Sequence, residues 1–281
     1  MAHAFRIVNV FTVDGDPFSG NPLCVFEDAR GLSDEQMQAL ARQMNLSETT
    51  FVLPSTRADA DAEVRIFTPG FEMPFAGHPT LGTASVVARG RDRVTLAMKA
   101  GLVPVTTTHG EWTLRAAKPP ATRPVEATPA QLAQMLGLPE DAVCDEPLWV
   151  DTGVEQLVIP IRSGGLVRAA RPVPELLERW GFSKARDEAM AYLWARGDHE
   201  HTVRFFFTSH GAVLEDPATG SACANLGGYL IAKHEQRPFA ATLRQGDQAG
   251  RPSRLRLRVE NDGGIYVSGA VIELGRGSVD I

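Results

Sequence analysis

Two short segments of the sequence carry residue types that suit proton transfer. They are EMPFAG (72–77) and EDPATG (215–220), which share the pattern Glu-x-Pro-x-x-Gly at positions 143 residues apart. His78 follows the first segment, Ser221 follows the second, and Asp216 lies inside the second. A histidine and a carboxylate that meet can share a proton and shift each other's pKa. The pattern therefore indicates acid–base chemistry at two equivalent places.

The glycines that end these two segments favour anion binding. Each segment follows a strand-like stretch and leads into a run of small residues that is typical of a buried helix. The first turn of a helix has unpaired N–H groups aligned with the helix dipole, and Gly77 and Gly220 let a ligand approach that backbone closely. We expect the two turns to offer donors to a carboxylate, and to an enolate-like oxygen formed during proton transfer.

Three glutamates are candidates for the acid–base group. Glu48 stands in NLSETTFV (45–52), where a helix gives way to an apolar strand with few basic residues nearby. Desolvation at the mouth of a buried strand would raise the pKa of Glu48, which suits a group that takes and returns a proton near neutral pH. Glu72 and Glu215 are the alternatives, and spacing alone does not choose among the three.

Periodicity and capping signals predict the elements that hold these residues. Ser33 before DEQMQALARQM predicts a capped amphipathic helix over 34–44. The proline-rich stretch 118–129 is interpreted as an inter-domain connection, and 183–200 as a loop that recognises the rest of the ligand. Other helices are expected at 79–90, 128–137, 172–182 and 223–235, and strands at 5–12, 20–26, 50–54, 63–69, within 94–116, and at 155–161, 201–209, 254–260 and 265–279.

A repeat in the sequence predicts the domain organisation. VRIFT (64–68) is echoed by VRFFFT (203–208), and each stretch precedes one copy of the Glu-x-Pro-x-x-Gly pattern. We interpret this as a duplication. It predicts two similar α+β halves, residues 1–117 and 118–281, with the active site in a cleft where their equivalent turns face each other. The last strand, about 270–281, is a candidate to pack with the first half.

Composition and charge exclude several classes of protein. The formal net charge is −6 and the basic residues are scattered, which excludes a nucleic-acid footprint. No apolar run is long enough to span a membrane and no signal peptide opens the chain, so we expect a cytoplasmic protein. Three widely spaced cysteines form no disulfide framework. His199 and His201 lack further ligands nearby, so no metal is expected.

The same residues carry a resemblance to a known family. NLSETTFV, RIFTPGFEMPFAGHPTLGTA (65–84), EDPATGSACANLGGYL (215–230) and GRPSRLRLRV (250–259) resemble segments of the phenazine-biosynthesis PhzF family, in order over nearly the whole chain. The resemblance implies a fold like that of diaminopimelate epimerase, with two pseudo-symmetric α+β domains, each a curved, mostly antiparallel sheet wrapped around a central helix. It also implies a homodimer that needs no cofactor.

The resemblance gives roles to the candidate residues. Glu48 matches the family's catalytic glutamate, and His78 and Asp216 match its characteristic histidine and aspartate. The family's enzyme isomerises a dihydro-hydroxyanthranilate by moving a proton between ring carbons. The resemblance therefore implies a cofactor-independent isomerase that acts on a small carboxylate-bearing substrate. The residues expected to bind that carboxylate are Gly77, Thr219, Gly220 and Ser221.

Two positions separate this chain from the racemases of the same fold. Those enzymes use a cysteine at each turn, whereas the equivalent residues here are Ala76 and Thr219, neither of which is a base. One carboxylate that acts on one face of the substrate therefore fits better than inversion of a stereocentre. The alternatives are a non-catalytic binder of small carboxylates, and an epimerase of amino or hydroxy acids that uses Glu48 with Asp216. Whether the substrate is a phenazine precursor is left open.

Overall fold

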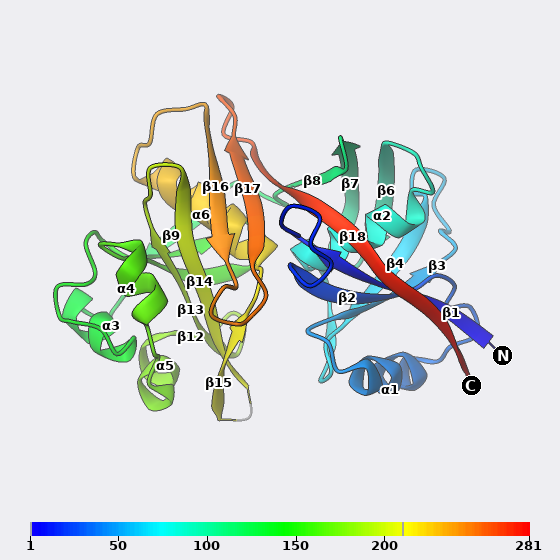
Figure 1. Cartoon of the computed structure of the whole chain (residues 1–281), viewed down its shortest axis with the longest axis horizontal. Coiled ribbons are helices and arrows are strands. Elements are labelled where there is room, and N and C mark those ends of the chain that lie inside the picture. The colour runs from blue at the N-terminus through cyan, green and yellow to red at the C-terminus, as the bar shows by residue number, and fades with distance from the viewer. Residues whose placement is uncertain (1, 210) are drawn as a thin grey trace. The chain divides into compact units, whose positions relative to one another are not determined.

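The computed structural model describes residues 2–209 and 211–281 (Figure 1). The chain divides into two compact units. Unit 1 comprises the residues up to Arg115 together with Ser268–Ile281, and unit 2 comprises Ala116–Val267. Both units contain strands and helices, so the fold is of the mixed α+β class that the sequence predicts.

Unit 1 is built mostly from strands, and its two helices differ in exposure. The helix α1 (Asp34–Met44) has one apolar face, whereas α2 (Gly77–Val87) is buried on nearly all sides. Its strands are β1 (Ala2–Val10), β2 (Asn21–Phe26), β3 (Thr49–Leu53), β4 (Ala62–Phe67), β5 (Glu72–Met73), β6 (Arg93–Met98), β7 (Gly101–Thr108), β8 (Glu111–Arg115) and most of β18 (Ile265–Asp280).

Eight strands of unit 1 form a closed circuit of pairings. The order is β18, β1, β2, β3, β4, β6, β7 and β8, and β8 pairs with β18 to complete the circuit. The pairs β2–β3 and β4–β6 are parallel, while the short β5 pairs with β4 in antiparallel orientation. The helix α2 packs against strands from both ends of this order, so it forms the centre of the unit.

The small residues of α2 explain how a helix fits inside the circuit. A Cβ atom placed on Gly82 would lie 2.6 Å from a methyl of Leu23 and 2.9 Å from a methyl of Val10. The side chains of β1 and β2 therefore lie directly against the helix backbone. A larger residue at this position would force the packed core apart, because protein interiors leave no spare volume.

The outer helix α1 confirms the capping signals in the sequence. Ser33 accepts a hydrogen bond from the backbone N–H of Gln36, and the Gln36 side chain accepts one from the N–H of Ser33. Asn45 ends the helix in the left-handed conformation, with φ of 51°, which asparagine adopts more readily than most residues. The chain then turns sharply and places Glu48 immediately before β3.

Unit 2 repeats the order of parallel and antiparallel pairs found in unit 1. Antiparallel β10–β11, parallel β11–β13, antiparallel β13–β14, parallel β14–β16 and antiparallel β16–β17 follow one another. The elements are β9 (Ala121–Pro124), α3 (Pro129–Met135), β10 (Leu148–Asp151), β11 (Glu155–Pro160), α4 (Gly164–Ala169), α5 (Pro174–Trp180), β12 (Phe182–Ser183), β13 (Glu188–Ala195), β14 (Glu200–Ser209), β15 (Ala212–Asp216), α6 (Gly220–Ala232), β16 (Phe239–Gln245) and β17 (Ser253–Val259).

The helices of unit 2 cover both faces of its sheet. The buried helix α6 packs against β9, β10, β11 and β17. The short helices α3, α4 and α5 gather on the other face (Figure 1), where they share one apolar core with β11, β13 and β14. As in unit 1, one helix rich in small residues lies against the sheet, and this helix begins at a glycine of the Glu-x-Pro-x-x-Gly pattern.

Two expectations from the sequence are wrong. The stretch 118–129 is not a bare connection, because β9 pairs with β10 inside unit 2; Pro124 is tolerated there because a strand end needs no further ladder donor. The stretch 183–200 is not a ligand loop, because its residues 188–195 form β13, a buried strand with partners on both sides. Its apolar letters AMAYLWA are typical of a central strand.

No helix in the described parts of the chain is long and apolar enough to cross a membrane.

Candidate active site

Glu48 and His78 lie next to each other in unit 1. The Glu48 Oε2 and His78 Nε2 atoms are 3.6 Å apart, and the two side chains are 15% and 5% exposed. Glu48 comes from the residue before β3, and His78 is the second residue of α2. The sequence predicts both as site residues, and the structure brings them together.

The hydrogen bonds of His78 define its tautomer. The ring bonds to the backbone of Pro22, and because proline has no N–H, the ring must donate to the Pro22 carbonyl. Nε2 makes no hydrogen bond among the described residues, so Nδ1 is the donor and Nε2 carries a lone pair toward Glu48. Burial lowers the pKa of His78 to about 3, although the bond to Pro22 opposes this shift. His78 is therefore neutral at physiological pH.

A buried side-chain bond fixes Glu48 relative to α2. Thr50, two residues after Glu48, and Thr83, on α2, share a hydrogen bond of 2.8 Å, and both residues are fully buried. The strand β3 is thereby fastened to the helix that carries His78. Sequence reasoning missed this pair; the only signal is two threonines in otherwise apolar surroundings.

The alternative acids Glu72 and Glu215 are both bound to arginines. Arg65 donates two hydrogen bonds to Glu72, at 2.8 and 2.7 Å. Arg204 donates two to Glu215, at 2.9 and 2.6 Å. The Arg65 bonds hold the pKa of Glu72 below its ordinary value. Each of these carboxylates already accepts two charge-assisted hydrogen bonds from an arginine, which leaves Glu48 as the candidate base.

Asp216 and Thr219 form a closed turn before α6. The Thr219 hydroxyl donates to the Asp216 carboxylate at 2.5 Å. Gln245, at the end of β16 and 1% exposed, donates to the Asp216 carbonyl at 2.9 Å and to the Thr219 hydroxyl at 3.0 Å. The predicted residues Asp216 and Thr219 are thus held together by a residue that the sequence did not single out.

Ser221 has a side-chain partner that sequence reasoning also missed. Gln156, the second residue of β11, donates from Nε2 to the Ser221 hydroxyl at 2.9 Å. Asn225, one turn further along α6 and fully buried, donates to Gln156 Oε1 at 2.8 Å. The sequence signal for this network was Asn225, a single asparagine in a helix of small apolar residues, because a buried amide needs hydrogen-bond partners.

The N-cap side chains leave the first turns of α2 and α6 uncapped, although the N–H of Thr219 itself donates to Gln245 Oε1 at 3.3 Å. Ala76 and Thr219 are the N-cap residues of α2 and α6, and neither makes a side-chain capping bond. Pro79 at the third position of α2 has no N–H, so α6 offers one backbone donor more in its first turn.

The two cysteines that lie in buried elements are inert, since burial raises the pKa of Cys24 to about 12 and raises that of Cys223 as well.

Residues 8–274 match the protein family described as "Phenazine biosynthesis-like protein". The chain belongs to this family. It is 40% identical over 280 residues to an uncharacterized isomerase of Pasteurella multocida, with 99% of this chain and 94% of the other covered. It is 36% identical over 269 residues to the trans-2,3-dihydro-3-hydroxyanthranilate isomerase of Pseudomonas aeruginosa, covering 93% and 92%.

The fold agrees with this membership. The crystal structure of the Bacillus anthracis phenazine biosynthesis protein of the PhzF family matches with a TM-score of 0.86 and 24% identity, over 100% of both chains. The named relatives are isomerases, and the chain is an isomerase of this family. The resemblance drawn from the sequence motifs is confirmed.

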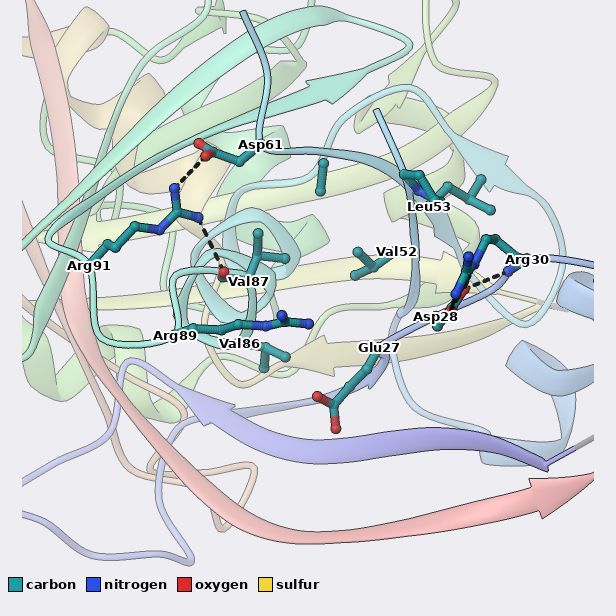
Figure 2. Close-up of a pocket in the computed structure, with 12 residues that line it drawn as sticks. Glu27, Asp28, Arg30, Val52, Leu53, Asp61, Val86, Val87, Arg89 and Arg91 are labelled. Carbon is teal, nitrogen blue, oxygen red and sulfur yellow. Dashed lines mark hydrogen bonds and ion pairs between the residues drawn. The ribbon is translucent and has the colours of Figure 1, made fainter. Parts of the chain in front are cut away.

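A pocket of about 370 Å³ in unit 1 is not the candidate site (Figure 2). Figure 2 shows that its charged rim is largely self-paired, with Arg91 on Asp61 and Arg30 on Asp28. Val86 and Val87 place the pocket at the C-terminal end of α2, the opposite end of the helix from His78. Helix carbonyls there disfavour an anion.

Within residues 2–209 and 211–281, no group of three or more His, Cys, Asp or Glu side chains is arranged to hold a metal.

Proposed function

We propose that this isomerase moves a proton between carbons of a small carboxylate-bearing substrate, with Glu48 as the acid–base group. The observation that carries the proposal is the contact between Glu48 Oε2 and His78 Nε2, which lie 3.6 Å apart and are largely buried. The relatives named for trans-2,3-dihydro-3-hydroxyanthranilate supply the substrate to test first.

The reaction needs one carboxylate and no other base. Glu48 removes a proton from a carbon next to a C=C bond, and the electron pair of the broken C–H bond forms a new double bond. The former π pair then takes the proton back from Glu48 at the far carbon. One carboxylate on one face of the substrate gives a suprafacial shift. The residues Ala76 and Thr219, which stand at the N-caps, take no part in the proton transfer.

In this proposal His78 holds the proton on Glu48 without taking it. Nε2 can accept a hydrogen bond, so it stabilises Glu48 once that residue has gained the substrate's proton. Because burial lowers the pKa of His78 to about 3, the proton stays on the carboxyl group and is available for return. A histidine that titrated near neutrality would compete for it.

The turn before α6 is proposed to bind the substrate's carboxylate. The first-turn N–H groups of α6, including those of Gly220 and Ser221, point along the positive end of the helix dipole. The Ser221 hydroxyl adds a side-chain donor at the same helix start. Asp216, closed onto Thr219, is proposed to orient the substrate's polar groups rather than its carboxylate, since like charges repel.

The test is turnover of trans-2,3-dihydro-3-hydroxyanthranilate in deuterated water. We expect solvent deuterium in the product, because the proton on Glu48 exchanges before its return. Glu48→Gln should lower kcat by about 10²- to 10⁴-fold with an unchanged far-UV spectrum. Glu63→Gln, on β4 of the same unit, is the matched control and should turn over normally. Near-normal turnover by Glu48→Gln would contradict the proposal.

A further inference from the structure

Ser221 belongs to a chain of hydrogen bonds that has only one consistent direction. The chain runs from the backbone of Thr152 through Asn225 and Gln156 to the Ser221 hydroxyl. All four residues lie in unit 2, and Thr152, Gln156 and Asn225 are at most 4% exposed. Because water has little access to these groups, each of them must satisfy its bonds within the chain.

The direction is set at the Asn225 end by backbone groups that cannot reverse. The N–H of Thr152 can only donate, and it lies 2.9 Å from Asn225 Oδ1. The carbonyl of Val154 can only accept, and it lies 2.8 Å from Asn225 Nδ2. The Asn225 amide therefore has a single allowed orientation. The Thr152 hydroxyl, which donates to Oδ1 at 2.7 Å, completes the set.

This orientation passes to Gln156 and then to Ser221. Asn225 has one N–H left for Gln156, so Gln156 must offer its oxygen there, at 2.8 Å. The Gln156 Nε2 group then faces Ser221 and donates to its oxygen at 2.9 Å. With that oxygen used as an acceptor, the Ser221 O–H is left to donate outward. Among the described residues it has no recorded acceptor.

We propose that Gln156, held by Asn225, is a positioning residue that keeps the Ser221 O–H available to donate, so that the start of α6 accepts a carboxylate in preference to a group that itself carries N–H or O–H. This rests on the proposed carboxylate role of the α6 turn. The Ser221 O–H then adds a donor beside the first-turn N–H groups of α6. A neutral amide of the same shape would set its own N–H groups against these donors.

The test compares binding of two probes of nearly equal shape, anthranilate and anthranilamide, to the full-length protein by calorimetry. Neither probe needs to be turned over, so the result is independent of Glu48. We expect the wild type to bind anthranilate about 10- to 100-fold more tightly than the amide, the range for a hydrogen bond to a charged group. Equal affinity for the two, or no binding of either, would overturn the proposal.

Two substitutions of Gln156 separate positioning from mere structure. Gln156→Met removes the donor and should weaken anthranilate binding in the wild type but not in Ser221→Ala, because its effect passes through that hydroxyl. Gln156→Glu reverses the polarity and should erase the preference for the carboxylate. Its affinity relative to wild type should recover as the pH is lowered, because a protonated carboxyl can again donate to Ser221.

The controls exclude trivial explanations of these results. Gln134→Glu, exposed on α3 of the same unit, adds the same charge and should leave both affinities unchanged. With the isomerase substrate, Gln156→Met should raise KM and leave kcat nearly unchanged, because the carboxylate contact is present in ground state and transition state alike. An equal loss of affinity from Gln156→Met in the Ser221→Ala background, or a loss of kcat alone, would contradict positioning through Ser221.

Discussion

The turns before α2 and α6 share one framework but have opposite hydrogen-bond polarity. In each unit the residue after the pattern glycine bonds to the second residue of a neighbouring strand: His78 to Pro22 of β2, and Ser221 to Gln156 of β11. Pro22 offers a carbonyl, so His78 donates to it and keeps a lone pair for Glu48. Gln156 offers an N–H, so Ser221 accepts from it and keeps a proton.

The difference teaches how one framework serves two chemical roles. The turn before α2, where His78 keeps a lone pair, suits a proton that is taken and returned. The turn before α6, where Ser221 keeps a proton to donate, suits an anion. Four residues beyond His78 stands Gly82, against which β1 and β2 pack with no room for a side chain. Four residues beyond Ser221 stands Asn225, which anchors Gln156. The polarity of each turn thus follows from the group that its partner strand offers, the Pro22 carbonyl in unit 1 and the Gln156 N–H in unit 2.

The largest expected effect concerns the ion pairs Arg204–Glu215 and Arg65–Glu72, and it tests whether they contribute equally to stability. Arg204→Met should lower the free energy of unfolding by about 3–5 kcal/mol, because it strands a buried carboxylate; the side chains of Arg204 and Glu215 are 5% and 13% exposed. Arg65→Met is the matched change in unit 1. It should cost less, because Lys99 still pairs with Glu72 at 2.6 Å. Urea denaturation measures both, and equal losses would refute the asymmetry.

The second effect concerns two glycines, Gly101 at the start of β7 and Gly246 directly after β16. Both have positive φ, 116° at Gly101 and 80° at Gly246, but a Cβ on Gly101 meets nothing within 4 Å. A Cβ on Gly246 would lie 2.2 Å from the carbonyl oxygen of Arg251 and 2.5 Å from that of Pro217, in the turn that holds Asp216. Gly101→Ala should cost about 1–2 kcal/mol from backbone strain, and Gly246→Ala about 2–5 kcal/mol, since a steric clash is added.

Thermal or urea unfolding of these two variants decides the point. If Gly101→Ala were as destabilising as Gly246→Ala, the close backbone contacts of Gly246 with Arg251 and Pro217 would contribute nothing to stability. Gly250→Ala offers a second control, because Gly250 also has positive φ, of 70°, and open space around it.

The smallest effect is a difference in pH dependence between the turns. Burial lowers the pKa of His78 from 6.5 to about 3, so below pH 6.5 the unfolded chain binds a proton that the folded chain does not. This contribution to stability is fully present above the unfolded pKa and is lost as the pH falls toward the folded one. Between about pH 7 and about pH 5 the loss is about 2 kcal/mol.

His78→Gln should remove that part of the pH dependence, as measured by urea unfolding across the same range. Ser221→Ala, the matched change in the other turn, should leave it intact, because serine does not titrate. Parallel curves for wild type and His78→Gln would show that His78 is not buried in its neutral form.

Local signals in the sequence predicted much of the fold. The helix over 34–44 was found with its N-cap, because Ser33 acts on the first turn that follows it. The strand β13 was missed, since an apolar stretch flanked by charges resembles a loop until two partner strands bury it. The sequence could not reject Glu72 and Glu215 as acids, because their arginines lie at different spacings, seven and eleven residues earlier.

By itself the sequence determined the family, the candidate residues Glu48, His78, Asp216 and Ser221, and the absence of thiols at Ala76 and Thr219. Only the tertiary structure decided whether His78 and Ser221 donate or accept their buried hydrogen bonds. His78 and Ser221 take their polarity from Pro22 and Gln156, dozens of residues away on strands that no local pattern connects to the helices. A hydrogen bond has a direction only once both partners are placed, and that placement is a property of the fold.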